Sequence, residues 1–305
     1  LLFSLLHKTV AGDSPVAVFL FSCFYGMIPM FVTYERKWLK YMRICSLASG
    51  SSGNCLYVGD GKHHILIDAG ISRKRIVDGL ARLGVRPQDL DGIFVTHEHS
   101  DHIQGIPMLV KMFDIPVYAT AGTLDAIRQK DKQGVIRMDH LYQLYPDQEI
   151  TMGSLDILPF HSYHDAMDPV CYSVHCGRKK MSIATDLGKF DDYIVDHLMG
   201  SEVLFLEANH DISMLETGPY PYPLKQRILG DRGHLSNEDS GRLLSRLADS
   251  PLKYTFLAHL SKENNYPELA YESVKCQLWE ELGLKKLPFE MEVARRDDLS
   301  TLITL

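Results

Sequence analysis

The feature that most constrains the fold is the segment 97–102, whose sequence is HEHSDH. Three imidazoles and two carboxylates lie within these six positions, one residue after the apolar run Ile93, Phe94 and Val95. That apolar run predicts a short buried strand. A cluster of metal-ligand residues therefore begins where a strand ends, which is the usual place for a site on an α/β scaffold.

The spacing within this segment indicates a site for more than one ion. His97 and His99 are two positions apart, so on an extended or turning backbone they face the same way. Asp101 and His102 follow and can face a second point nearby. We interpret the segment as half of a dinuclear site, with ligands that suit Zn²⁺ and with Mn²⁺ or Fe²⁺ as alternatives.

Four later strands also end in residues of the metal-ligand type. They are predicted within residues 148–160 (two strands with a turn at Gly153), 180–186, 203–207 and 254–259. The residues at their ends are His161 and His164, Asp186, Glu207 and His259. Chemistry alone leaves the choice between His161 and His164 open. A carboxylate at Asp186 could bridge two cations about 3.5–4 Å apart.

The remaining pattern predicts an α/β layered fold. Residues 54–58 and 64–68 flank the turn 59–61 and predict a β-hairpin. Further along, the pattern predicts helices over 73–83, 103–113 and 121–128 and a strand over 116–120. Asp68 ends the second hairpin strand, where it could hydrogen-bond the ligand segment or cap the next helix, for which Ser72 is a competing cap.

Two loops are candidates for binding phosphate. The segment 46–54 (SLASGSSGN) could cradle an anion with the groups of Ser49, Gly50, Ser51 and Ser52. Residues 221–227 combine aromatic rings with Lys225 and Arg227, and Arg232 follows, which suits a phosphate backbone with stacked bases.

Bulk composition excludes little but sets limits. The 305 residues are 45% hydrophobic, enough for one large domain or two small ones. The net charge of −7 gives nucleic-acid binding no support, so such binding would need a local basic patch. None of the six cysteines forms C-x-x-C, and Cys45, Cys55 and Cys171 lie in strand-like runs, which indicates buried free thiols in a reducing compartment.

Residues 1–41 form an apolar N-terminal extension. Residues 15–32 carry no charge and are just long enough for a transmembrane helix, and the Arg and Lys residues that follow would keep the C-terminal side in the cytoplasm. Alternatively, Met42 directly precedes a natural first strand, so residues 1–41 could be upstream translated sequence. We favour an appendage outside a catalytic domain at 42–305, which is cytoplasmic and without stable membrane association in either case.

The H-x-H-x-D-H segment and the ordered strand-end residues resemble the metallo-β-lactamase superfamily, over residues 42–305. The resemblance implies a four-layer αββα sandwich that holds two divalent metal ions, Zn²⁺ or Mn²⁺. It selects His164, because Asp165 follows it, and places Asp165 behind the ligands. It implies one metal on His97, His99 and His164, a second on Asp101, His102 and His259, a bridge at Asp186, and Asp68 bracing the ligand segment.

Within the superfamily, the chain resembles the YycJ/WalJ (VicX-like) exonuclease group. His102 argues against true β-lactamases, residues 103–105 lack the Gly-Gly of glyoxalase II-like enzymes, and residues 186–259 leave no room for a β-CASP domain. The segments that carry the closer match are 46–54, 164–166, 207–211, 233–237 and 258–265. The group is associated with 5′ to 3′ exonuclease action on DNA, with DNA repair as the implied setting, and with a cell-wall two-component system.

This resemblance implies a metal-dependent phosphodiesterase acting on DNA rather than RNA. Asp101 or Asp186 would orient the attacking water. His234 lies in a Gly-His element similar to one in ribonuclease Z-like enzymes, so it would protonate the leaving oxygen, positioned by Glu207. Ser236 behind it predicts the cap of a helix at 237–248.

Two other classes of function stay open at this stage. A small-molecule metallohydrolase of an ester, thioester or lactam would use the same ligands on a carbonyl and would leave DNA intact. A metal-binding partner of a cell-wall signalling system would bind metal tightly without turnover. The sequence assigns no oligomeric state.

Overall fold

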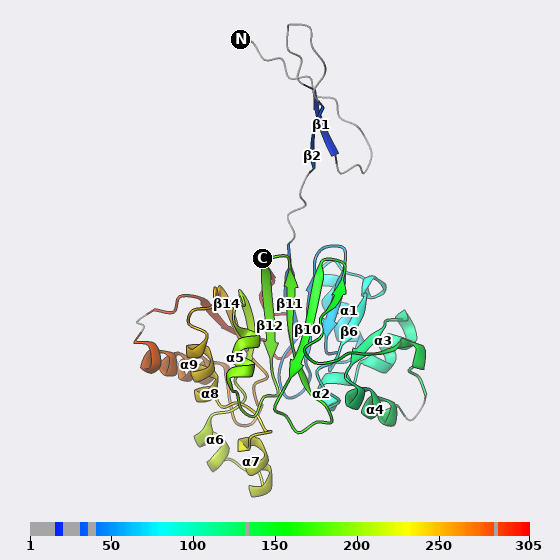
Figure 1. Ribbon diagram of the computed structural model, residues 1–305. Coiled ribbons are helices and arrows are strands. Elements are labelled where there is room, and N and C mark those ends of the chain that lie inside the picture. The colour runs from blue at the N-terminus through cyan, green and yellow to red at the C-terminus, as the bar shows by residue number, and fades with distance from the viewer. Residues whose placement is uncertain (1–15, 21–30, 36–40, 132–133, 284–285) are drawn as a thin grey trace, which may run out of the picture. The chain divides into compact units, whose positions relative to one another are not determined.

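The computed structural model describes residues 16–20, 31–35, 41–131, 134–283 and 286–305 (Figure 1). The chain divides into two compact units, Leu1–Lys40 and Tyr41–Leu305. In the first, β1 (Val16–Leu20) pairs antiparallel with β2 (Phe31–Glu35). The candidate transmembrane segment 15–32 thus has strands where it is described, and its residues 15 and 21–30 lie outside the described part. Among the described residues, no helix combines the length and apolar character needed to cross a bilayer.

The described residues of the second unit form two seven-stranded mixed sheets. The first has the order β16 (Ile303–Thr304), β3 (Arg43–Ala48), β4 (Cys55–Gly59), β5 (His64–Ile67), β6 (Gly92–Phe94), β7 (Val117–Ala119), β8 (Leu141–Gln143). The second has the order β15 (Glu290–Val293), β14 (Tyr254–Ala258), β13 (Val203–Glu207), β12 (Lys179–Ala184), β11 (Val170–Cys176), β10 (Leu155–His161), β9 (Ile150–Met152).

Three separate apolar clusters stack these sheets and their helices into four layers. One cluster joins the first sheet to α1 (Arg73–Arg82), α3 (Ile106–Phe113) and α4 (Ala121–Lys130). A second fills the space between the two sheets. The third joins the second sheet to α5 (Asp192–Leu198), α8 (Asn237–Arg246) and α9 (Pro267–Leu282). The predicted αββα sandwich is confirmed.

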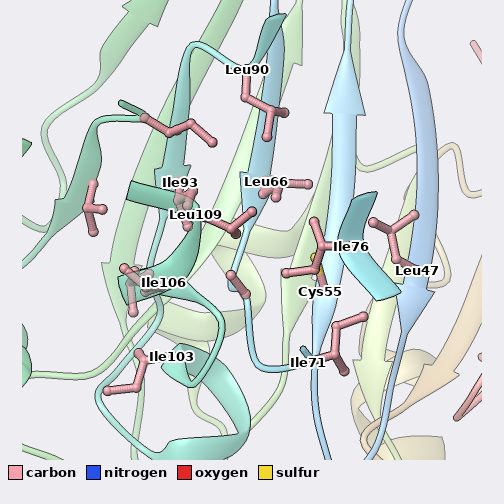
Figure 2. Close-up of a cluster of buried hydrophobic side chains, with 14 of the residues drawn as sticks. Leu47, Cys55, Leu66, Ile71, Ile76, Leu90, Ile93, Ile103, Ile106 and Leu109 are labelled. Carbon is pink, nitrogen blue, oxygen red and sulfur yellow. The ribbon is translucent and has the colours of Figure 1, made fainter. Parts of the chain in front are cut away.

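The first of these clusters shows why the sequence pattern predicts the fold (Figure 2). Ile76 and Ile106 come from the apolar faces of α1 and α3, and they pack with Leu66 and Ile93 from adjacent strands. All four side chains are fully buried. At about 25 cal/mol per Å² of buried apolar surface, such contacts supply the main force that holds each helix layer to its sheet.

Parallel pairing brings the ends of distant strands to one edge of the sandwich. β5 and β6 are parallel neighbours, and so are β12, β13 and β14. The segments that follow these strands therefore meet at their common carboxyl end. The short helix α2 (Ser100–Ile103) lies at this end, which we call the catalytic end, together with α6 (Ile212–Thr217) and α7 (Tyr222–Leu229) (Figure 1).

Most elements predicted from the pattern are present. The hairpin is β4–β5, Ser72 caps α1 by accepting a hydrogen bond from the amide of Arg75, and Ser236 caps α8 in the same way through Asp239. The helix predicted over 103–113 is present as α3 from Ile106 to Phe113, but it starts three residues later than predicted. The chain forms α2 and α3 with a break at Gly105, because the amide of Gly105 donates to the Ala69 carbonyl (2.8 Å) and ties the chain to the end of β5.

The predicted free thiols are confirmed for the cysteines of the strands. Cys45, Cys55 and Cys171 are buried and unbridged, and so is Cys176. Cys276 is also free but exposed on α9, and Cys23 lies outside the described residues. Burial raises the pKa of Cys45 to about 11 and that of Cys171 to about 12, so these thiols are packing groups rather than nucleophiles.

Gly70 provides a test of how tightly the ligand segment packs on β5. A Cβ atom at Gly70 would lie 1.5 Å from the backbone oxygen of Asp101, which no rotamer change can relieve. We expect Gly70→Ala to lower the free energy of unfolding by about 1–3 kcal/mol and to weaken metal binding, as measured by urea denaturation and zinc titration. Gly79→Ala is the control, because its Cβ would meet only the tips of flexible leucine side chains. Unchanged metal affinity in Gly70→Ala would contradict the prediction.

Candidate metal centre

The first group of candidate ligands consists of three imidazoles. Ligand atoms of His97, His99 and His164 all lie within 4.8 Å of one another, and His164 Nε2 is 3.2 Å from His99 Nδ1. His97 and His164 are buried and His99 is half-buried. His164 Nδ1 donates to the Gly233 carbonyl (3.0 Å), which turns Nε2 toward the other two rings. His161 is exposed, so of the two histidines left open by the sequence the structure brings His164 to the cluster.

The second group adjoins the first and includes a carboxylate. Asp101 Oδ2 lies 3.5 Å from His102 Nε2 and 3.3 Å from His259 Nε2. All three ligand atoms again fall within 4.8 Å of one another. His259 comes from the end of β14, more than 150 positions after Asp101, because the two sheets place their strand ends side by side.

The carboxylate of Asp186 lies between the two groups. Its Oδ1 is 3.5 Å from His164 Nε2 and 3.6 Å from His259 Nε2, and its Oδ2 is 3.2 Å from His102 Nε2. The side chain is only 4% exposed, so it faces the histidines rather than solvent. This is the position that a bridging carboxylate would take.

Buried carboxylates hold the outward nitrogens of the second-group histidines. Asp68 accepts from His102 Nδ1 at 2.7 Å, and its other oxygen accepts from the amide of Thr96 at 2.8 Å. Glu207 Oε1 lies 3.0 Å from His259 Nδ1 and 2.8 Å from His234 Nδ1. Carboxylates placed in this way fix the tautomer and orientation of a metal-binding histidine and raise its basicity.

The electrostatics of the site favour bound cations. Burial lowers the pKa of His97, His99 and His164, so these imidazoles are neutral and able to bind metal. Burial alone would also lower the pKa of His259, but Asp186 and two other carboxylates raise it to about 10. His102 is raised well above its ordinary pKa in the same way. The carboxylates thus draw positive charge to this point, and a divalent cation supplies it.

Two orphaned atoms point to the same conclusion. Within the described residues, His97 Nε2 and Asp186 Oδ2 are buried and form no hydrogen bond, although Asp186 Oδ2 lies 3.2 Å from His102 Nε2. Such groups cost about 1–3 kcal/mol each when they stay unsatisfied. Both belong to the mixed set of imidazole nitrogens and carboxylate oxygens that suits zinc and similar divalent cations. The residues present therefore fit the metal ions that the sequence pattern implies.

Three of the central side chains project from left-handed backbone. Asp68, Asp186 and His259 have φ of 60°, 58° and 56°. Each follows a strand, and the sharp change of direction aims its side chain across the sheet edge. Non-glycine residues in this region carry strain of about 1–3 kcal/mol, although Asp and His tolerate it better than most. The site is therefore shaped by backbone strain as well as by side-chain packing.

The proposed anion-binding loop is mostly used internally. Ser49 Oγ accepts from the amide of His259 (2.9 Å), and the amide of Gly50 donates to Asn54 Oδ1 (2.9 Å). The amide of Ser51 points to the Leu260 carbonyl (3.5 Å). The side chains of Ser51 and Ser52 are exposed, so hydroxyls rather than backbone amides are what this loop offers a ligand.

The cations predicted near the site are also partly occupied. Arg227 forms a two-contact ion pair with Asp165, which lies 3.4 Å from His164 Nε2. The pair links α7 to the ligand loop, whereas His164 Nδ1 is held by a carbonyl and not by Asp165. Lys225 Nζ donates to the Glu216 carbonyl (2.7 Å) at the end of α6.

Sequence reasoning missed several polar groups that hold the ligands. Asn54 Nδ2 lies 3.1 Å from His102 Nε2 and 3.4 Å from Asp101 Oδ2. Asn209 Nδ2 donates to the His259 carbonyl (2.9 Å), and Glu98 Oε1 accepts from the amide of Met167 (3.0 Å). Asn54 and Asn209 occur inside the segments that carry the family resemblance, which was the available signal.

Asp68→Asn tests the brace on His102. Asparagine tolerates left-handed backbone, so the fold should persist. Its single oxygen cannot accept from both Thr96 and His102, so one donor loses its partner. We expect zinc affinity to fall by about 10- to 100-fold, measured by calorimetric titration. Asp60→Asn, in the turn at the other end of β4 and β5, should leave zinc affinity unchanged. Equal affinities in the two variants would contradict the brace.

Comparison with known proteins shows the family to which this chain belongs. The family described as beta-lactamase superfamily domain matches residues 63–259. The chain is 39% identical to exodeoxyribonuclease WalJ of Streptococcus pneumoniae over 232 residues, covering 76% of this chain and 86% of the relative. It is also 39% identical to exodeoxyribonuclease YycJ of Bacillus anthracis over 237 residues, covering 78% and 89%.

A solved structure shows the same fold at low identity. The metallo-beta-lactamase fold protein YhfI of Bacillus subtilis matches with a TM-score of 0.62 and 15% identity, covering 86% of this chain and 99% of that chain. The two sheets, the histidine and aspartate groups at their common edge, and these matches agree with one another. The chain belongs to the metallo-β-lactamase superfamily, in the group of the WalJ/YycJ relatives.

Proposed function

We propose that this protein is a metal-dependent exodeoxyribonuclease that hydrolyses phosphodiester bonds. The observation that carries the proposal is the pair of adjoining ligand groups that face Asp186, in a chain that spans 86% and 89% of relatives named exodeoxyribonuclease. DNA rather than RNA, removed in the 5′ to 3′ direction, is the substrate we assign, and the cytoplasm is the compartment that suits its free thiols.

Two divalent ions, Zn²⁺ or Mn²⁺, would be held at this centre. The ligands to the first would be His97, His99 and His164, those to the second would be Asp101, His102 and His259, and Asp186 would contact both. Ions in such a site supply an activated water and neutralise charge on the phosphoryl oxygens.

In this proposal Asp101 orients the attacking water. Burial alone would raise the pKa of Asp101, but His102 and His259 hold it well below its ordinary range. The carboxylate is therefore an anion at neutral pH and accepts a hydrogen bond from water. It is 22% exposed, more than Asp68, Asp186 or Glu207, so of these carboxylates it is the one that solvent can reach.

In this proposal His234 protonates the leaving oxygen. Its ring lies 5.3 Å from that of His259 and 5.0 Å from that of His164, measured between ring centroids. Its Nδ1 is held by Glu207 at 2.8 Å, so Nε2 is the nitrogen left for substrate. His234 and His259 lower the pKa of Glu207 to about 2, which keeps the brace charged.

The function is tested on the full chain loaded separately with Zn²⁺ and Mn²⁺ and given end-labelled single- and double-stranded DNA and RNA. We expect stepwise metal-dependent shortening of DNA from the 5′ end. Asp101→Ala and His259→Ala should abolish it, since each removes one ligand of the second group. Lys253→Ala, at the start of β14, is the control for general damage.

Other outcomes would redirect the assignment. Metal-loaded protein that leaves every polynucleotide intact but turns over a chromogenic ester, thioester or lactam would identify a small-molecule hydrolase. Metal binding without any turnover would indicate a binding partner. Full activity in His259→Ala would contradict the second metal.

His234 can be separated from metal binding. We expect His234→Ala to lower kcat by about 10²- to 10⁴-fold while the zinc content stays at the wild-type value, because no predicted ligand is removed. Single-turnover cleavage rates and metal analysis of the same preparations measure the two quantities. Loss of zinc in this variant would instead place His234 among the ligands.

A further inference from the structure

Most cations at the catalytic end already have a partner. Lys74 pairs with Asp78 at 2.7 Å, Arg75 with Asp297 at 3.2 Å and Lys189 with Asp231 at 2.8 Å. Others donate to backbone carbonyls: Lys130 to Glu98, Lys225 to Glu216 and Arg296 to Leu260. In a chain of net charge −7 the three ion-paired cations provide little attraction for a polyanion. The other three keep their charge, but their carbonyl acceptors hold the side chains against the protein.

Three cations at this end are different. Within the described part of the chain, the side chains of Arg73, Arg232 and Lys262 form no hydrogen bond or ion pair. Arg232 and Lys262 are exposed and Arg73 is half-buried. A charged side chain without a partner keeps its full attraction for a phosphate, because no carboxylate has to be displaced.

Each of the three follows or precedes a backbone group that touches the metal centre. Arg73 comes three positions after Gly70, whose backbone packs on that of Asp101. Arg232 precedes Gly233, whose carbonyl accepts from His164. Lys262 comes three positions after His259. The three cations therefore stand beside three different ligand segments of one centre.

The exposed serines of the loop at 49–53 extend this surface. The Cβ position of Gly53 lies 2.5 Å from Ile71 Cγ2, so the loop packs against the segment that leads into Arg73. Ser51 and Ser52 belong to this loop, and their side chains are exposed. Hydroxyls combined with unpaired cations form a typical contact surface for phosphate oxygens.

We propose that Arg73, Arg232 and Lys262 bind the phosphates on either side of the scissile phosphodiester. The proposal rests on the proposed function for the identity of the polyanion. The proposal accounts for how an acidic protein would bind DNA. The basic side chains lie beside the metal centre, and their contacts with the phosphate backbone of DNA are independent of base sequence.

Salt dependence measures such contacts directly. Binding of a fluorescent, phosphorothioate-linked oligothymidylate, which resists cleavage, is followed by anisotropy with the zinc-loaded full chain from 50 to 300 mM salt. Each single change to alanine should weaken binding and reduce the slope of log K against log salt by about 0.7, and the triple variant should lose about 2. Zinc content should not change.

Arg178 and Lys179 provide matched controls. They lie at the start of β12, eight and seven residues before Asp186, about 25 Å from the centre along the strand. Arg178→Ala is compared with Arg73→Ala and with Arg232→Ala, and Lys179→Ala with Lys262→Ala. The controls remove the same charge, and their side chains form no ion pair among the described residues, so a general charge effect would appear equally in both sets.

The outcomes separate this surface from the nuclease assignment. If the slope of log K against log salt falls in the three variants and not in the controls, the proposed phosphate-binding surface is supported, even if the protein cleaves no DNA. Cleavage by wild-type protein with equal slopes in variants and controls overturns the surface and leaves the nuclease intact. Wild-type protein that binds no oligothymidylate overturns the surface as well.

Discussion

The burial of two carboxylates beside five imidazoles is the constraint on which the rest of the site depends. Asp186 and Glu207 are both inside the protein, and each raises the cost of ionising the other. An isolated buried carboxylate would be protonated. Here the pKa of Asp186 is held well below its ordinary value, because His259, His102 and His97 surround it. Each buried charge is stabilised only by the opposite charges around it. Displacing one side chain would therefore change the ionisation of the others.

That interdependence explains the architecture around the centre. Glu207 Oε2 accepts from the amides of Leu187 and Leu235, while its other oxygen faces His234 and His259. One carboxylate thus connects the strand end that carries Asp186, the loop before α8 and the end of β14. The same side chain sets the orientation of a candidate ligand and of the candidate acid, so geometry at the two is linked.

The fold was predictable because its pattern is local. Apolar runs with turn signals predict β4, β5, β9 and β10, apolar periodicity predicts α1, and the cap at Ser236 predicts α8. The break between α2 and α3 was not predictable, since it depends on the Gly105 amide reaching Ala69 across the sheet end. The strands β8, β15 and β16 are short or partly polar, and only pairing with a neighbour makes them strands.

The candidate site also has a part that the sequence predicts and a part that it does not. Residues that end strands were recognisable, because a histidine or aspartate after an apolar run is a distinct signal. Apart from Asp68 and Glu207, the groups that hold them were not recognisable, because Asn54, Thr96 and Asn209 act through contacts between segments distant in sequence. The internal pairing of Arg227 with Asp165 and the inward direction of Ser49 likewise depend on tertiary structure, and composition carries no sign of either.

The left-handed backbone at Asp68, Asp186 and His259 limits how this centre can evolve. A residue with positive φ is readily replaced by Asn, Asp, His or Gly and with difficulty by β-branched or bulky side chains. Glutamate or cysteine, which would change the preferred cation, meets a backbone penalty before any question of coordination arises. Main-chain geometry therefore restricts which ligands can replace Asp186 and His259. We expect substitutions that change the preferred metal to be rarer at these two positions than at His99 or Asp101, where φ is negative.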